Sequence, residues 1–166
     1  MALTSPFRRR RDGRYAVKLN RNLRAVLVSV AEQLGPMIDA DDEATTRLFP
    51  PAYLGNDSSS AEEEYRSLVD EPLRNHHHRA LDVLIDTAHA DTLSADELTA
   101  WLSAIGSMRL VLGTRLDVME EMEPPEPGSP GADEFVLYQL LSAVQNEMVE
   151  MLADELPDDG NPERTL

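Results

Sequence analysis

The chain has 166 residues, of which 42% are apolar, and this is enough for one domain with a packed core. It contains no cysteine, which excludes disulfides, thiol catalysis and thiol redox sensing. No apolar run is long enough to span a bilayer, and no apolar signal segment follows the first arginines. We therefore expect a cytoplasmic protein that does not contact a membrane.

The formal net charge of −16 is distributed unevenly along the chain. Residues 1–24 hold eight basic residues and one acidic residue, Asp12, which gives a local charge of +7. Residues 25–166 hold seven basic and 30 acidic residues, which gives −23. The whole molecule therefore repels nucleic acid, whereas its N-terminal part can attract an anionic partner.

The first predicted element is a β-hairpin at residues 6–19. Asp12-Gly13 lies between two extended runs and favours a two-residue type I′ turn. An isolated hairpin is marginally stable, so we expect it to pack on helices. Its apolar face is expected to consist of Phe7, Tyr15, Val17 and Leu19, and the other face is expected to be lined by Arg8, Arg9, Arg10, Arg11 and Arg14.

The next predicted helix covers about residues 21–34, and Asn20 is placed to cap it. Gly35-Pro36 is expected to end or kink this helix. An acidic connector and a proline-containing apolar segment follow.

A capping box formed by Ser60 and Glu63 predicts a helix at about 60–70. Pro72 is expected to interrupt it, with a second helical segment continuing to about residue 88.

Ser94 and Glu97 form another capping box, which opens a predicted helix at about 95–121. A proline-rich linker is expected at 123–131, followed by a last helix at about 132–155. The last helix is apolar on most sides, which is typical of a central helix or of a dimer seam.

Together these elements predict an all-α fold, a bundle of four to five helices with an N-terminal β-hairpin. Residues 1–156 are expected to form one helical domain, followed by a disordered acidic tail at 157–166. The broad apolar surface of the last helix favours a homodimer.

Two glycines and an arginine lie on one stripe of the predicted helix at 95–121. Gly106 and Gly113 are seven residues apart, and Arg109 lies between them, so a neighbouring helix can approach closely there. An arginine at such a contact needs a partner, and Glu147 is the expected one, in a structural ion pair. The alternative is that Arg109 clamps an anion or another ligand.

Four segments resemble an uncharacterised actinobacterial family, a domain of unknown function whose members are labelled AosR-like oxidative-stress transcriptional regulators. The segments are RLFPPAY (47–53), EEYRSLV (63–69), WLSAIGSMRLVLGTRLDV (101–118) and LYQLLSAVQ (137–145). The resemblance covers residues 6–152, and its most specific element is RLVLGTRL (109–116) with Trp101 upstream.

This resemblance implies regulation of transcription through RNA polymerase or a sigma factor, through DNA, or through both. Family members tend to be encoded near the adaptor of the Clp protease, so an acidic adaptor or scaffold in regulated proteolysis is the alternative. Members proposed to sense oxidants use a cysteine pair, which this chain lacks, so the signal that it senses is open. Asparagine commonly stands in the family where Gly106 stands here.

No motif in the sequence indicates an enzyme or a cofactor. The three histidines of NHHHRALD (75–82) are consecutive, so on a helix they point about 100° apart and cannot converge on one metal ion. His78 and Asp82 could hold one edge of a metal site, but nothing at ligand spacing completes it.

The hairpin arginines Arg8, Arg9, Arg10, Arg11 and Arg14 are the predicted contact surface for a partner or for DNA. They could neutralise phosphates, meet an acidic protein surface, or pair with the acidic side chains of this chain itself.

Overall fold

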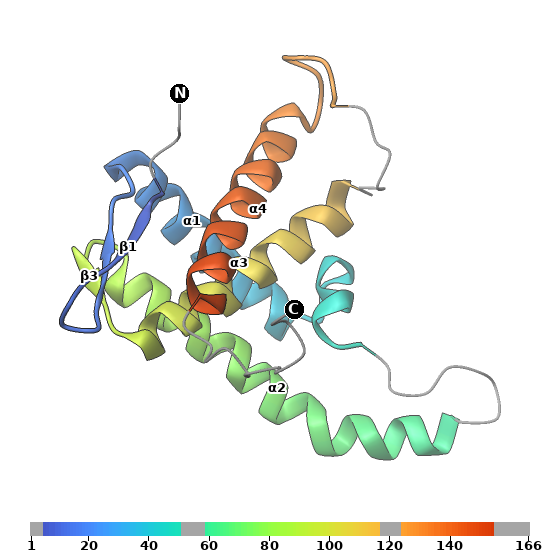
Figure 1. The fold of residues 1–166 in the computed structure, drawn as a ribbon. Helices are drawn as coiled ribbons and strands as arrows, with labels where there is room; N and C mark the ends of the chain where they lie inside the picture. The colour runs from blue at the N-terminus through green and yellow to red at the C-terminus, as the bar shows by residue number, and fades with distance from the viewer. Residues whose placement is uncertain (1–4, 51–58, 117–123, 155–166) are drawn as a thin grey trace, which may run out of the picture.

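The computed structural model describes residues 5–50, 59–116 and 124–154, and this part of the chain is mostly helical (Figure 1). The predicted fold class, a helical bundle with an N-terminal hairpin, is confirmed. The elements in chain order are β1 (Phe7–Arg9), β2 (Tyr15–Val17), α1 (Arg21–Asp39), the 3₁₀ helix η1 (Glu43–Leu48), α2 (Ser59–Thr87), β3 (Thr92–Leu93), α3 (Ala95–Leu116) and α4 (Ala132–Ala153).

Helix α3 is the centre of the fold and contacts α1, η1, α2 and α4. Its apolar residues recur at helical spacing and supply the most deeply buried side chains of the core. One core cluster includes residues of the hairpin and of every helix. The side chains of α3 that are fully buried are Leu98, Trp101, Ala104, Ile105 and Met108.

The hairpin is the first two strands of a three-stranded antiparallel sheet of order β1-β2-β3. Phe7 pairs with Val17, and Tyr15 pairs with Leu93 of β3. The predicted apolar face of the hairpin is confirmed, because all four of its side chains are buried. The strand β3 was not predicted, because two residues directly before a helix cap carry no alternation.

The turn of the hairpin differs from the predicted type I′ turn. The backbone N–H of Gly13 donates to the carbonyl of Arg10, and the N–H of Arg10 donates to the carbonyl of Arg14. Gly13 has a φ of +83°, whereas Asp12 is not among the residues with positive φ. The loop is therefore the three-residue form, in which a turn is followed by a left-handed glycine. Asp12 accepts a hydrogen bond from the backbone N–H of Arg14.

Helix α1 begins as predicted and ends later than predicted. The Asn20 side chain accepts a hydrogen bond of 2.8 Å from the backbone N–H of Leu23, which confirms the cap. Pro36 lies inside the last turn of the helix. In helical conformation a proline ring clashes with the backbone N–H and the Cβ of the preceding residue, and Gly35 has no Cβ, so part of this clash is absent.

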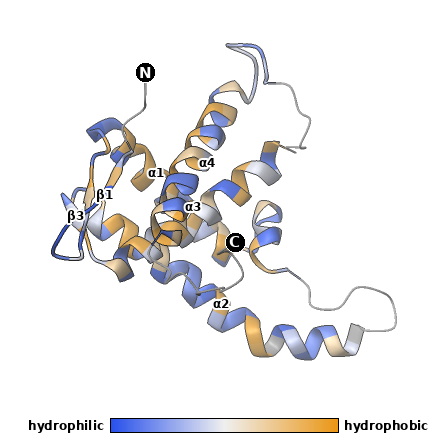
Figure 2. Ribbon diagram, viewed as in Figure 1, coloured by the Kyte–Doolittle hydropathy of each residue, from blue (hydrophilic) through white to orange (hydrophobic). Residues whose placement is uncertain are grey.

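Helix α2 is continuous through Pro72, so the predicted interruption is wrong. A proline leaves the carbonyl four residues earlier without its helical donor, here that of Leu68. Both residues are exposed, with Leu68 at 70%, so water can reach this carbonyl. The first turns of α2 extend beyond the rest of the bundle, and Figure 2 shows that much of this helix is hydrophilic.

The capping box of α3 is confirmed in both directions. The N–H of Glu97 donates to Oγ of Ser94 at 3.1 Å, and the N–H of Ser94 donates to Oε1 of Glu97 at 2.8 Å. The end predicted for this helix, beyond residue 116, and the predicted tail at 157–166 lie outside the described residues. In the described part of the predicted linker, turns lead to Gly131, the N-cap of α4. None of the described helices is long and apolar enough to cross a membrane.

Candidate functional site

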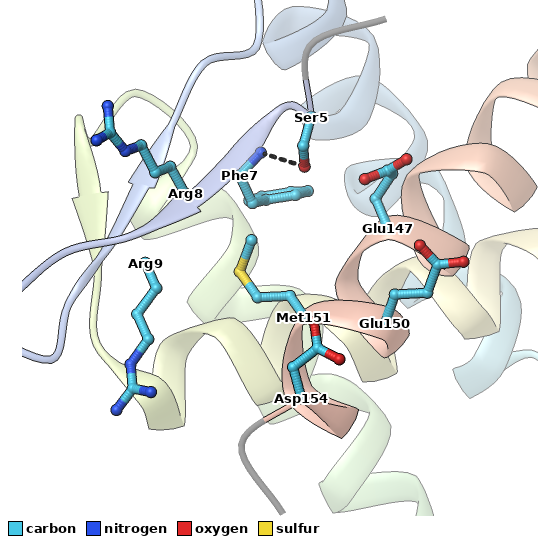
Figure 3. A pocket seen from close by; sticks show the side chains of 8 residues that line it. All are labelled: Ser5, Phe7, Arg8, Arg9, Glu147, Glu150, Met151 and Asp154. Atoms are coloured by element: carbon cyan, nitrogen blue, oxygen red, sulfur yellow. Dashed lines mark hydrogen bonds between the residues drawn. The ribbon is translucent and has the colours of Figure 1, made fainter. Parts of the chain in front are cut away.

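The predicted arginine surface lies on the hairpin at one edge of the molecule (Figure 1), and all five side chains are exposed. Figure 3 shows that Arg8 and Arg9 leave β1 in opposite directions. Arg8 and Arg11 make no hydrogen bond or ion pair with any described residue. These two guanidinium groups therefore point to solvent without a protein acceptor in the described part of the chain.

Two of the other arginines are held by the protein itself. Arg14 donates to the hydroxyl and the carbonyl of Thr92 at 3.0 and 3.3 Å, and it lies 3.7 Å from a carboxylate oxygen of Glu97. Arg10 lies 3.4 Å from the carboxylate of Asp12. Pairing with the chain's own acids thus applies to these two residues, and Arg14 serves mainly to bind β3 to the hairpin.

A buried arginine, which the sequence analysis did not single out, fixes the base of the hairpin. Arg24 on α1 is only 8% exposed. Its guanidinium has no carboxylate partner among the described residues and instead donates to backbone carbonyls at 2.7 to 3.0 Å. It thereby joins the end of the hairpin to the loop between α2 and β3. The acceptors are the carbonyls of Val17, Leu19, Ala88 and Ala90.

An aromatic contact holds the first strand on the core. The rings of Phe7 and Trp101 are perpendicular, with centroids 6.4 Å apart. The indole N–H of Trp101 donates to Oγ1 of Thr87 at 2.7 Å. Because a buried indole needs an acceptor, this bond fixes the position of the ring on which the hairpin rests.

An open pocket of about 400 Å³ lies between β1 and the C-terminal part of α4 (Figure 3). Phe7 and Met151 supply its apolar surface, with arginines on the hairpin side and carboxylates on the helix side. Acidic and basic groups are therefore adjacent at this edge of the molecule. The carboxylates belong to Glu147, Glu150 and Asp154.

The predicted ion pair between Arg109 and Glu147 is absent from the structure. Arg109 donates from Nε to Oγ of Ser142 at 2.7 Å and from Nη1 to Oε1 of Gln145 at 3.4 Å. Its guanidinium also lies over the ring of Tyr138, 5.4 Å from the centroid. Glu147 lies instead at the pocket beside the hairpin. It follows Gln145 by two positions, which is about 200° around a helix, so it does not share the face of α4 that meets Arg109.

The close approach of helices at the glycine stripe is confirmed. A Cβ atom on Gly106 would lie 3.1 Å from Nε2 of Gln145, and one on Gly113 would lie 3.2 Å from the ring of Tyr138. Both distances are shorter than ordinary van der Waals contact. The glycines therefore allow the side chains that hold Arg109 to lie against α3.

The three consecutive histidines contact three different groups. His76 lies 3.2 Å from the hydroxyl of Ser103, and His78 lies 2.8 Å from the carboxylate of Asp39. His77 is buried, with Nε2 3.1 Å from the carbonyl of Leu48. Among the described residues, no three histidine or carboxylate side chains gather as a metal site would require.

The burial of His77 predicts that the protein loses stability as the pH falls from 7.5 to 5.5. Burial lowers the pKa of His77, and the charges of His76 and His78 lower it further, against the hydrogen bond to the Leu48 carbonyl, which raises it. The unfolded chain then binds a proton more readily than the folded one below a pH of about 6.5. The contribution of His77 to the free energy of unfolding is fully present above that pH. It decreases as the pH falls toward the lower pKa that His77 has in the folded state.

This pH dependence is measured by urea unfolding at pH 7.5 and 5.5. We expect His77→Gln to reduce the difference between the two values, because the new side chain cannot take up a proton. The exposed His89 provides the control, and His89→Gln should leave the difference unchanged. Equal differences in the wild type and in His77→Gln would contradict the prediction.

No curated protein and no solved structure gives a significant match. A family model matches residues 4–152, which include the hairpin, the described helices except the last residue of α4, and the residues that hold Arg24 and Arg109. The chain therefore belongs to the family described as a domain of unknown function (DUF2017).

Proposed function

We propose that this chain is a non-enzymatic regulatory protein that acts by contact, and that the hairpin arginines are its contact surface. The observation that carries the proposal is the pair Arg8 and Arg11, two exposed guanidinium groups without a partner among the described residues of a chain with a net charge of −16. Because Arg24 and Trp101 fix the hairpin on the core, a partner meets a surface that is ordered before binding.

The charges around the hairpin favour a protein partner over DNA. Phosphates present a uniformly negative surface, which the carboxylates of Glu147, Glu150 and Asp154 next to the hairpin would repel. A protein surface with both acidic and basic groups can match the arginines and these carboxylates together. The resemblance to AosR-like regulators supports transcription control, so we propose RNA polymerase or a sigma factor as the partner.

The proposal is tested by capturing tagged protein from the native host, with and without nuclease, followed by mass spectrometry. We expect RNA polymerase or a sigma factor to be retained after nuclease treatment, and Arg8→Ala/Arg11→Ala to lose it by about tenfold or more. The control is Arg21→Ala/Arg79→Ala, which makes the same change in net charge at exposed residues of α1 and α2, outside the hairpin. Equal retention by both variants would contradict the role of the hairpin.

Two other results would redirect the proposal. Clp components in place of the transcription machinery would favour the acidic adaptor, which the net charge of −23 on residues 25–166 supports. Capture that nuclease abolishes would favour DNA. In that case a plot of the logarithm of the DNA affinity against the logarithm of the salt concentration should have a negative slope. Arg8→Ala/Arg11→Ala should reduce the size of this slope by up to about 2, because it removes two charges that can contact phosphate. An unchanged slope would exclude hairpin contacts to phosphate.

We also propose that the protein is a homodimer through α4. Val136 and Leu140 on this helix are 62% and 39% exposed, and they lie one turn apart on the same face. The mass of the protein in solution tests this.

A further inference from the structure

A second surface, formed by none of the hairpin residues, carries positive charge that no acidic side chain of its described lining compensates. An open groove of about 420 Å³ lies among η1, α2, α3 and α4. Although the chain has 31 acidic residues, none of the described residues that line this groove is acidic. Its polar lining consists of Arg47, His77, Ser103, Ser107, Arg109 and Gln145.

The guanidinium of Arg109 is held in place at the groove, but only some of its N–H donors have an acceptor among the described residues. Ser142 and Gln145 accept two of its hydrogen bonds, and the Tyr138 ring lies against its face. A guanidinium has five N–H donors, so three find no acceptor among the described residues. All of these partners are neutral, so no described carboxylate neutralises the charge of Arg109.

A second guanidinium reaches the groove from another element. Arg47 lies on η1, is exposed, and makes no hydrogen bond or ion pair with any described residue. Leu102 and Leu110 of α3 add apolar surface beside the two arginines, and Leu110 is 38% exposed. The groove therefore combines two cations with a small apolar wall, which is the chemistry that recognises an anionic group attached to an apolar one.

We propose that this groove binds a small molecule that carries a phosphate or a carboxylate group. Arg109 is the main contact to the anion, because its orientation is already fixed and its remaining donors match two oxygen atoms. Arg47 adds a second positive charge. The site uses none of the hairpin residues, so it goes beyond the contact function proposed above.

The test is a ¹H–¹⁵N NMR titration of the full chain with inorganic phosphate, against sodium chloride at matched ionic strength. The signals of the Gly106 and Ser107 amides and of the Gln145 side chain report on the groove. We expect saturable shifts with phosphate and none with chloride. Arg109→Gln should weaken the binding at least tenfold, whereas Arg115→Gln, on the same helix but outside the groove, should change it less than twofold.

A parallel titration with acetate distinguishes phosphate from carboxylate. The anion that binds more tightly indicates which of the two groups the ligand carries. Arg109→Lys keeps the charge but loses the planar pair of donors, so binding should weaken there as well. If Arg109→Gln fails to fold, Arg47→Gln serves the same purpose, with a smaller expected loss. The inference is overturned if neither anion gives saturable shifts, or if the shifts are unchanged in both arginine variants. Arg8→Ala/Arg11→Ala should bind phosphate normally, so the two proposals can fail independently.

Discussion

Arg24→Met is expected to lower the free energy of unfolding by about 3 kcal/mol, the larger part of which comes from unpaired backbone carbonyls. In the native protein one guanidinium donates to four carbonyls at the junction of the hairpin with the loop after α2. Methionine fills a similar volume but donates no hydrogen bond. The carbonyls would then be buried without their donor, or the base of the hairpin would open to admit water.

Urea unfolding followed by circular dichroism measures this effect, and the midpoint should fall with little change in slope. Arg21→Met provides the control, because Arg21 is exposed on the first turn of the same helix. It should change the stability by less than about 0.5 kcal/mol. Arg24→Lys keeps the charge but cannot reach four acceptors, so an intermediate loss is expected. Similar stabilities for the Met variants at positions 24 and 21 would show that the carbonyl contacts contribute little.

Trp101→Ala is expected to cost about 3–5 kcal/mol, because it leaves a large cavity at the centre of the core. Trp101 is fully buried, meets the ring of Phe7, and donates to Thr87. Its loss removes the surface on which β1 rests, so the hairpin should loosen together with the core. Since this is the only tryptophan, unfolding of the variant is followed by far-ultraviolet circular dichroism and not by fluorescence.

Two variants separate the contributions to this effect. Trp101→Phe keeps much of the apolar volume but leaves Oγ1 of Thr87 without its donor, so a loss of about 1–2 kcal/mol is expected. Leu110→Ala, at a half-exposed position on the same helix, should cost less than either. A Trp101→Ala variant as stable as Leu110→Ala would contradict the large contribution of this ring to the free energy of unfolding.

The features that could be predicted from the sequence are those that local chemistry determines. Alternation placed Phe7 and Tyr15 on the buried face of the hairpin, and side-chain oxygens at Asn20 and Ser94 marked the first turns of α1 and α3. These signals depend on residues within a few positions of one another. Gly113 is a similar case. Its position on a helical stripe predicts that a neighbouring helix approaches closely, but does not identify Tyr138 as the residue in contact.

The structure differs from the sequence-based predictions where distant contacts or solvent override a local preference. Gly35-Pro36 predicts the end or a kink of one helix, and Pro72 predicts the interruption of another. A preceding glycine at Pro36 and exposure at Pro72 allow each helix to continue. The partner of Arg109 depends on the rotation of α4 about its own axis, which spacing alone does not determine. Arg24 was counted as one of several N-terminal basic residues, because carbonyl acceptors leave no trace in the sequence.

The three-stranded sheet also has a consequence for the order of events during synthesis. Arg14 and its acceptor Thr92 are 78 residues apart, and the carbonyls that hold Arg24 lie in the same distant loop. At about 5–20 residues per second, the ribosome adds that loop roughly 4 to 16 s after the hairpin. Until then the arginine-rich segment lacks its third strand and two of the acceptors of Arg24, and isolated two-stranded hairpins are marginally stable. The segment that is translated first is therefore among the last to complete its tertiary contacts, and a chain arrested before residue 88 would present it without them.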